Sequence, residues 1–353
     1  MVWKPKEKEL TPEEAIKMAK AELAPYWIGS PPLLAAVKNS QGKASAYPLD
    51  VTFAEQKWLL LFFNPTDLAG QNALIYFMEW QKRFAGEDLK VLAIMKPVYQ
   101  FFKEPQSLEQ LSRKMELPFP LISDANELLF AAFGVTELPS VLLIDRNKHI
   151  FKKSGLHWME GLELELHRFF RSHDPGLPLL PPYKPAVKLP EDIMRIEFGH
   201  GRGARFSAPG FGNPMNGFSS GKFAASGATK RGAGEINLVG TWIQDGDRII
   251  TSDPKAELSI EIPTSRFGMI AKSLSKTVEV PRVNLEVGGI PANDAFGDEH
   301  LSFDEEGQSC VQVEEGRFYQ VLFKLPTKSR LLTLKFPMAA RIQVALYGFR
   351  FSE

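Results

Sequence analysis

Cysteine is almost absent from this chain: of its 353 residues only Cys310 has a thiol. A single cysteine excludes an intramolecular disulfide and any zinc site built on cysteine pairs. Disulfide exchange within the chain therefore lacks its second sulfur, and a redox role would need an intermolecular partner. In its apparent strand, Cys310 is best interpreted as a small buried filler.

Net charge and long apolar runs are missing as well. Forty-two Lys and Arg residues balance 42 Asp and Glu residues, so no overall field favours nucleic acid or an anionic membrane. No apolar run approaches the ~20 residues of a spanning helix, and residues 1–8 lack the apolar core of a secretory signal. We therefore expect no membrane association and, by default, a cytoplasmic protein; a leader missing from the sequence would make it periplasmic.

Metal-binding patterns are not found either. The six histidines form no close pair, and His167 and His173 straddle a predicted helix end, so they would not share one face. The acidic residues between Asp294 and Glu306 do not follow the EF-hand spacing and are interpreted as a solvated loop. The sequence predicts no metal and no cofactor.

What is present is ordinary globular composition, 44% hydrophobic and 24% charged, at a length that suits two domains. Six prolines between Ser172 and Pro190 mark a stiff boundary. We predict a helical segment at 1–25 that begins at a Thr11 capping box, an α/β domain at 26–172, a Pro-rich linker at 173–193, and a β-sandwich at 194–353 with a Gly- and Phe-rich entry loop at 199–234.

The first domain alternates apolar strands with amphipathic helices, which is typical of a covered sheet. A nearly continuous apolar strand, Trp58–Phe63, leads into a helix that continues to about Phe84. We predict Ser107 as the N-cap of a later helix. The remaining predicted elements are strands at 89–95, 140–145 and 149–153 and helices at 107–115, 126–133 and 159–170.

From Glu235 onward the pattern is all β. Many short alternating segments separated by Gly, Pro and Asp turns predict a sandwich or jelly roll. The predicted strands are 235–242, 248–251, 257–262, 267–272, 283–287, 308–313, 319–324, 331–336 and 342–351.

Residues 26–172 resemble the thioredoxin-like fold of the TlpA and peroxiredoxin class. The resemblance rests on the strand Trp58–Phe63 running into a helix, on Leu138-Pro139 just before an apolar strand, and on the final strand pair and helix. It implies a cis-proline at Pro139 and, beside Leu138 and Pro139, a groove for an extended peptide.

The same resemblance locates the missing active site. In the TlpA register Asp67 and Gly70 occupy the two cysteine positions, with Leu68 and Ala69 between them; in the peroxiredoxin register Asn72 falls near the peroxidatic position. Neither register supplies sulfur, so we predict no catalytic residue here. Asp67 is most simply interpreted as a helix N-cap.

The second half resembles the C-terminal β-domain of DipZ-type proteins, a fold similar to carbohydrate-binding modules. The matching segments are Glu197-Phe198-Gly199, Gly240-Thr241-Trp242, residues 284–291, residues 316–319 and the closing residues 344–349. A glycan site would stack sugar rings on exposed aromatics, for which Trp242, Tyr319 and Tyr347 are the candidates; aromatics at strand positions are otherwise core residues.

Residues 200–205 and 230–232 are similar to Arg- and Gly-rich nucleic-acid segments, with phenylalanines interleaved. Because the resemblance places part of this run at the entry to the β-domain, we expect these rings to pack rather than to bind nucleic acid.

Three functions follow from these observations. The first is a redox-inactive binding or scaffold protein, with a glycan, a protein or an extended peptide as partner. The alternative is a thiol–disulfide oxidoreductase or peroxiredoxin-related enzyme that uses a non-standard site such as Cys310. The third is self-association through residues 199–234, giving a homo-oligomer. We favour the first, in which the protein is not an enzyme.

Overall fold

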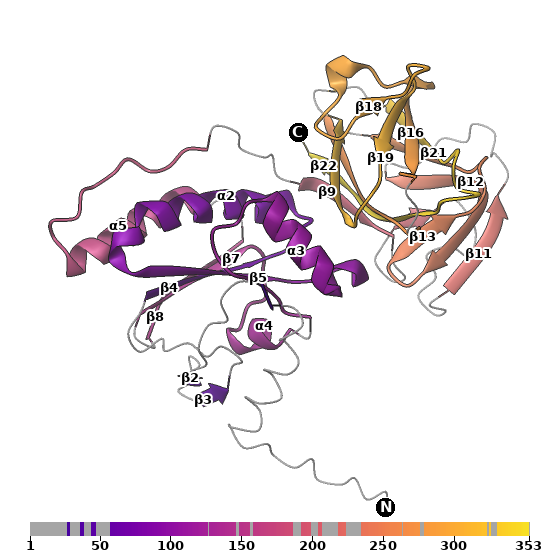
Figure 1. Cartoon of the computed structure of the whole chain (residues 1–353). Helices are drawn as coiled ribbons and strands as arrows, with labels where there is room; N and C mark the ends of the chain where they lie inside the picture. The colour runs from indigo at the N-terminus through magenta and orange to yellow at the C-terminus, as the bar shows by residue number, and fades with distance from the viewer. Residues whose placement is uncertain are drawn as a thin grey trace, which may run out of the picture. The chain divides into compact units, whose positions relative to one another are not determined.

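The chain folds into two compact units, Met1–Leu189 and Pro190–Glu353 (Figure 1). The predicted helix after Thr11 and most of the 199–234 segment lie outside the residues that the structure describes. The structure is a computed structural model, and it describes residues 27–28, 36–38, 44–46, 57–125, 127–145, 148–155, 158–185, 192–198, 204–206, 218–223, 234–262, 264–275, 279–322, 325 and 330–352.

A six-stranded mixed sheet forms the centre of the first unit. Its spatial order is β1 (Trp27–Ile28), β6 (Leu121–Ser123), β5 (Leu89–Met95), β4 (Lys57–Phe63), β7 (Ser140–Asp145) and β8 (Lys148–Ser154). Strands β4, β5 and β6 are parallel, whereas β1, β7 and β8 run antiparallel to their neighbours. Two further strands, β2 (Ala36–Lys38) and β3 (Ala44–Ala46), pair only with each other.

Both faces of this sheet are covered, which explains why β4 and β5 are almost continuously apolar. Helices α2 (Leu68–Arg83) and α5 (Met159–His173) lie on one face, and α4 (Leu128–Ala132) lies on the other (Figure 1). On the α4 face the rings of Phe62 and Phe130 meet edge to face at 5.1 Å within one buried apolar cluster. The shorter elements are η2 (Ala85–Glu87), η3 (Gln100–Lys103) and α3 (Pro105–Lys114).

The start of α3 corrects one prediction. Ser107 lies inside the helix, which begins at Pro105 with Glu104 in the N-cap position. Proline is suited to the first helical position because its fixed φ is helical and its missing N–H is not needed there. The preference of proline for the first helical position, and not the capping preference of serine, therefore decides where α3 begins.

The second unit is built from layers that share one long strand, and its strand pairs are antiparallel except for the short parallel pair β10–β12. The path of hydrogen-bonded strands is β18-β19-β16-β21-β14-β12-β13-β22-β15-β20, with β10 and β11 on β12, β17 on β16 and β9 on β22. The strands are β9 (Asp192–Glu197), β10 (Arg205–Phe206), β11 (Phe218–Phe223), β12 (Glu235–Asp245), β13 (Arg248–Thr251), β14 (Glu257–Ile262), β15 (Arg266–Ser273), β16 (Arg282–Val287), β17 (Ile290–Pro291), β18 (Ser302–Phe303), β19 (Ser309–Gln312), β20 (Arg317–Leu322), β21 (Arg330–Lys335) and β22 (Val344–Ser352), with η4 at Asp294–Phe296.

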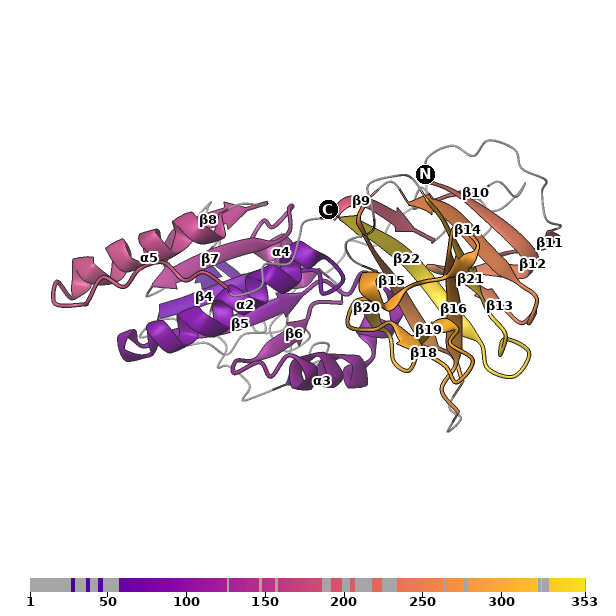
Figure 2. The ribbon, with the colours of Figure 1, turned by 90° about the horizontal axis from the view of Figure 1, so that it is seen from above.

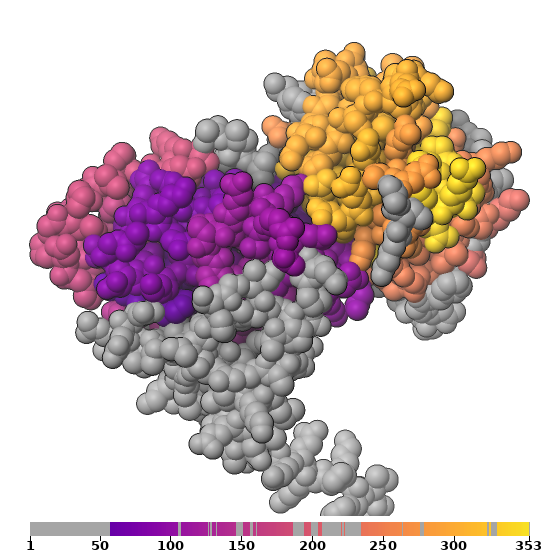
Figure 3. Space-filling model, in the orientation of Figure 1, coloured from indigo at the N-terminus to yellow at the C-terminus, as the bar shows by residue number. Residues whose placement is uncertain are grey.

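The shared strand β12 changes partner at Gly240. Residues 237–239 pair with β14, and residues 242–245 pair with β13. Gly240 has φ +87°, and a Cβ there would lie 2.8 Å from the Cα of Ala256. Only glycine suits both requirements, so this residue lets one strand serve two layers. Figure 3 draws the same units with all their atoms, and over the face in view the coloured atoms of each unit pack against one another.

The predicted fold class is confirmed: a thioredoxin-like α/β domain is followed by an antiparallel β-region.

The sequence did not indicate β11, which lies within the segment that was predicted to be an entry loop. Its six residues pair with β12 from Phe218↔Asp245 to Phe223↔Gly240. It is therefore a strand because it pairs with β12, and its own sequence has no alternating apolar pattern that would predict one. Among the described residues, no helix combines the length and apolar character needed to cross a membrane.

Candidate functional site

The turn between β4 and α2 is the position at which a thioredoxin-like protein would have its cysteines. Asn64 organises this turn: its Oδ1 accepts the backbone N–H of Thr66 at 3.0 Å and the Thr66 hydroxyl at 2.9 Å. The Asp67 N–H donates to the Asn64 carbonyl at 3.2 Å, which closes the turn. The chain therefore enters α2 through a local hydrogen-bonded turn that needs no sulfur.

Asp67 occupies the N-cap position of α2, with an extended backbone, but its carboxylate makes no capping hydrogen bond. The interpretation of Asp67 as a side-chain cap is therefore wrong, although its position is right. The side chains of Asp67, Leu68 and Ala69 are buried, at 5%, 4% and 3% exposure. These residues face the interior and present neither a nucleophile nor an open surface.

Gly70, at the second cysteine position of the TlpA register, has no room for a side chain. A Cβ built there would lie 2.4 Å from the backbone oxygen of Asn64. Real Cβ atoms essentially never approach a backbone atom so closely, so the turn or the helix would have to move. The turn is thus shaped around a residue without a side chain.

The loop before β7 lies at the same end of the sheet. Antiparallel pairing of Phe62 with Ser140 places Pro139 beside the end of β4, from which the turn departs. The Leu138–Pro139 peptide bond is cis. Pro139 is buried, whereas Leu138 is half-buried and Glu137 is exposed.

Two donors hold the Pro139 carbonyl. The Gly155 N–H donates to it at 3.0 Å, and the Trp158 indole N–H lies at 3.4 Å from it and 2.6 Å from the Gly155 carbonyl. The Ser140 hydroxyl also contacts the Ser154 hydroxyl at 2.8 Å. Trp158, which the sequence analysis missed, therefore supports this loop; an aromatic directly before a helix and shortly after a glycine was the available signal.

Lys152 of β8 supports the chain that leads into the loop. Its ammonium donates to the carbonyl of Phe133 at 3.3 Å and to that of Gly134, at the end of α4. Although Lys152 is exposed as a whole, partial desolvation lowers its pKa, and the charge of Glu137 acts in the opposite direction. A cation at a helix C-terminus is favourable because the last carbonyls are otherwise unpaired.

The only thiol lies elsewhere. Cys310 is in β19 of the second unit, 1% exposed, with its sulfur 3.4 Å from the Ser302 hydroxyl. The prediction that it fills space in a buried strand is confirmed. The described residues hold no group of three or more His, Cys, Asp or Glu side chains arranged to bind a metal.

The three aromatics predicted to stack on a glycan are all in the core of the second unit. Trp242 and Tyr319 are fully buried and Tyr347 is 1% exposed. The Trp242 ring meets Phe336 edge to face at 5.2 Å, and the Tyr319 hydroxyl donates to the Glu315 carbonyl at 2.8 Å. Burial raises the pKa of Tyr319. Stacking a sugar on these rings is therefore excluded in this structure, because none presents a face to solvent.

The sequence profile described as the AhpC/TSA family matches residues 35–153, so this part of the chain is similar to that family. No curated protein matches the chain.

Several solved structures are similar to part of this chain. A putative thioredoxin from Neisseria meningitidis is 18% identical, with 42% of this chain and 95% of that chain covered and a TM-score of 0.32. StoA from Bacillus subtilis is 18% identical, with 38% and 96% covered and a TM-score of 0.29. The bacterioferritin comigratory protein of Xanthomonas campestris is 18% identical, with 40% and 91% covered and a TM-score of 0.30.

Proposed function

We propose that this protein is a thioredoxin-like binding module that works without thiol chemistry and holds an extended peptide at the loop before β7. The observation that carries the proposal is the location of sulfur: the one thiol, Cys310, is buried in the second unit. Asp67 and Gly70 stand at the turn instead, and neither attacks a disulfide or a peroxide.

The backbone of Leu138 is the proposed contact. Among the hydrogen bonds of the described residues, none involves the N–H or the C=O of Leu138, and its side chain is half-buried. The next carbonyl, of Pro139, is already held from within the chain. An extended peptide can pair with one free N–H and one free C=O as an added strand does, and this contact requires no sulfur.

A binding experiment with two tryptophan variants tests this proposal. Short unstructured peptides are selected by display on the full chain, and affinities of the enriched peptides are measured for W158F and W80F. Trp158→Phe removes the indole N–H that supports the loop, whereas Trp80→Phe removes a buried indole N–H for which the structure shows no hydrogen-bond partner. We expect W158F to weaken binding and W80F to leave it unchanged. Failure to enrich peptides, or equal affinity of both variants, would contradict the proposal.

Activity assays test the enzymatic alternative. The wild-type chain and C310S are compared in reduction of insulin disulfides and in consumption of peroxide. We expect neither protein to turn over at an enzyme-like rate. Turnover that C310S loses would show that the lone thiol is a working site and would replace the binding proposal by a redox one.

We extend the same proposal to the second unit, which the DipZ-like resemblance suggests as a ligand-binding or scaffold domain. Because Trp242, Tyr319 and Tyr347 are buried, we propose a protein rather than a glycan as its ligand. A ligand at ~100 times its dissociation constant adds ~2.7 kcal/mol of stability. Oligosaccharides should therefore leave the melting temperature of the full chain unchanged, and a clear upward shift would favour the glycan.

A further inference from the structure

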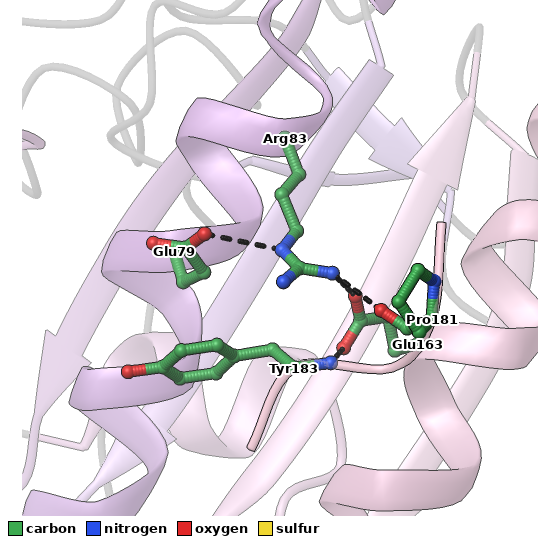
Figure 4. A network of polar contacts seen from close by, with 5 residues as sticks. All are labelled: Glu79, Arg83, Glu163, Pro181 and Tyr183. Carbon is green, nitrogen blue, oxygen red and sulfur yellow. Dashed lines mark hydrogen bonds and ion pairs between the residues drawn. The ribbon is translucent and has the colours of Figure 1, made fainter. Parts of the chain in front are cut away.

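The extended segment after α5, residues 177–185, is fastened to the first unit by side chains from two helices, and we call it the strap (Figure 4). Arg83 of α2 donates to the Pro181 carbonyl at 2.7 Å, and the Tyr183 N–H donates to Glu163 Oε2 of α5 at 2.7 Å. The strap doubles back beside α5 and contacts both α5 and α2 (Figure 2). It is thus held by its backbone, as an extended ligand would be.

The two anchoring side chains also bind each other. Glu163 Oε1 accepts from Arg83 at 2.9 Å, and Arg83 in addition pairs with Glu79 at 3.1 Å (Figure 4). The guanidinium carbon lies 5.5 Å from the centre of the Tyr183 ring, which meets the Tyr76 ring edge to face at 5.6 Å. Glu163 is fully buried, so its carboxylate depends on these donors for its charge.

A second titratable group lies one helical turn beyond Glu163. His167 is 1% exposed, its ring meets Phe84 at 4.9 Å, and neither ring nitrogen has a hydrogen-bond partner among the described residues. A buried polar group without a partner is costly, so it requires an explanation. Positions four apart on a helix are neighbours, so Glu163 is the carboxylate within reach of this imidazole.

The charges around His167 come from both helices. Burial lowers the pKa of His167; Glu163 opposes this shift, and Arg83 and Arg171 add to it. Burial and the two arginines therefore favour the neutral imidazole while the strap is bound. Once protonated it has two donors and no acceptor, and it competes with Tyr183 for the same carboxylate.

We propose that the strap is an acid-sensitive latch, in which protonated His167 draws Glu163 away from Tyr183 and releases the strap from α2 and α5. One proton binds to a free ring nitrogen, and the imidazolium then donates to Glu163. Arg83 does not become an unpaired charge, because it keeps Glu79. The strap loses the acceptor for Tyr183.

Release has a mechanical consequence. The strap is followed in the chain by the second unit, so the latch determines where the chain leaves the first unit. An open latch lengthens the covalent tether between the units and uncovers the Tyr76 ring. Protonation of His167 favours the open state, because the pKa of His167 is lower while the strap is bound than after its release.

Hydrogen exchange of the Tyr183 amide tests the latch directly. Its protection, corrected for the intrinsic exchange rate, is measured in the full chain at pH 7.5 and pH 5.0. We expect this protection to fall roughly five- to tenfold at the lower pH. That factor is at the lower end of the range by which binding at one site of a protein changes the affinity of another. The amide of Leu60 in central strand β4 should keep its protection, which distinguishes local release from unfolding.

Three variants complete the design. H167F should remove the pH dependence, and H167Q provides the same test if the phenylalanine disturbs packing. H173Q is the matched control, because His173 is on the same helix but its side chain is 44% exposed, and it should behave as wild type. Full protection at pH 5.0 in the wild type, or unchanged loss of protection in H167F and H167Q, would overturn the proposal. Its outcome is independent of peptide binding.

Discussion

Gly70 shows how one residue without a side chain constrains the turn before α2. Its neighbour across the turn is the backbone oxygen of Asn64, which would lie 2.4 Å from an added Cβ. The close approach is between backbone segments, so no flexible side chain can relieve it. Placing a Cys-x-x-Cys pattern at Asp67 and Gly70 would therefore require the turn to be rebuilt.

Gly70→Ala should destabilise the protein by about 1–3 kcal/mol, the usual cost of overpacking a tight site. The matched control is Gly161→Ala in α5, where an added Cβ meets nothing within 4 Å. There the change should stabilise by ~0.5–1 kcal/mol, because alanine is the better helix former. Urea unfolding of the two variants measures both values, and equal effects would contradict the steric argument.

His167 should make stability depend on pH. Its pKa in the folded protein is lowered, chiefly by burial, so the unfolded chain binds the proton more tightly. The free energy of unfolding must then fall as the pH drops below ~6.5, the ordinary value for histidine.

His167→Phe should therefore flatten this part of the stability–pH curve. Denaturant unfolding of wild type and variant at pH 7.5, 6.5 and 5.5 provides the comparison. Two parallel curves would show that other groups cause the acid sensitivity.

At the scale of secondary-structure elements, the contact between α2 and α5 depends on a buried ion pair. Glu163 is 1% exposed and Arg83 19% exposed at the side chain, whereas the pair Glu109–Arg113 on α3 is 58% and 75% exposed. A charge left in the interior is costly, whereas an exposed pair is screened by water.

Glu163→Ala should consequently cost ~3 kcal/mol, at the low end for a broken buried pair because Arg83 retains Glu79. Glu109→Ala should cost less than ~0.5 kcal/mol. Thermal unfolding of both variants measures the difference. A small effect of Glu163→Ala would mean that the strap and its anchors add little to the stability of the first unit.

The α5 sequence contained a sign of this arrangement. Met159, Leu162, Leu166 and Phe170 form an apolar stripe at helical spacing, and Glu163 and His167 fall beside it. Charged or titratable residues on a buried face need partners. The pattern indicates that partners exist, but Arg83 lies 80 residues earlier, and only the folded chain shows that it is one of them.

At the scale of the whole molecule, each unit has an apolar core of its own. Cys310 is a natural reporter of the second unit, because it is the only thiol and is 1% exposed. We expect a thiol reagent to label no cysteine in the native protein and one per chain after unfolding.

The labelling rate of Cys310 can also show whether the two units unfold independently. Glu163→Ala changes the first unit, so it should lower that unit's stability without accelerating the labelling of Cys310. Faster labelling in this variant, measured by mass spectrometry under native conditions, would show that the two units unfold together.

The sequence alone determined the order of the two folds and the presence of a single thiol, Cys310. Strand and helix periods are local properties, and the composition states how many cysteines exist. Trp58–Phe63 could therefore be recognised as a central strand, and the turn after it as one without sulfur.

Tertiary structure decided what each side chain does. In the folded chain Trp242, Tyr319 and Tyr347 are core residues, and no space remains for a side chain at Gly70. Arg83 and Glu163 form an ion pair beside the strap. The alternation of side chains along a strand shows which residues share a face of the sheet. It does not show which of the two faces is covered by the rest of the protein. Close approach and ion pairing depend on segments far apart in the chain, so they are determined only when the chain is folded.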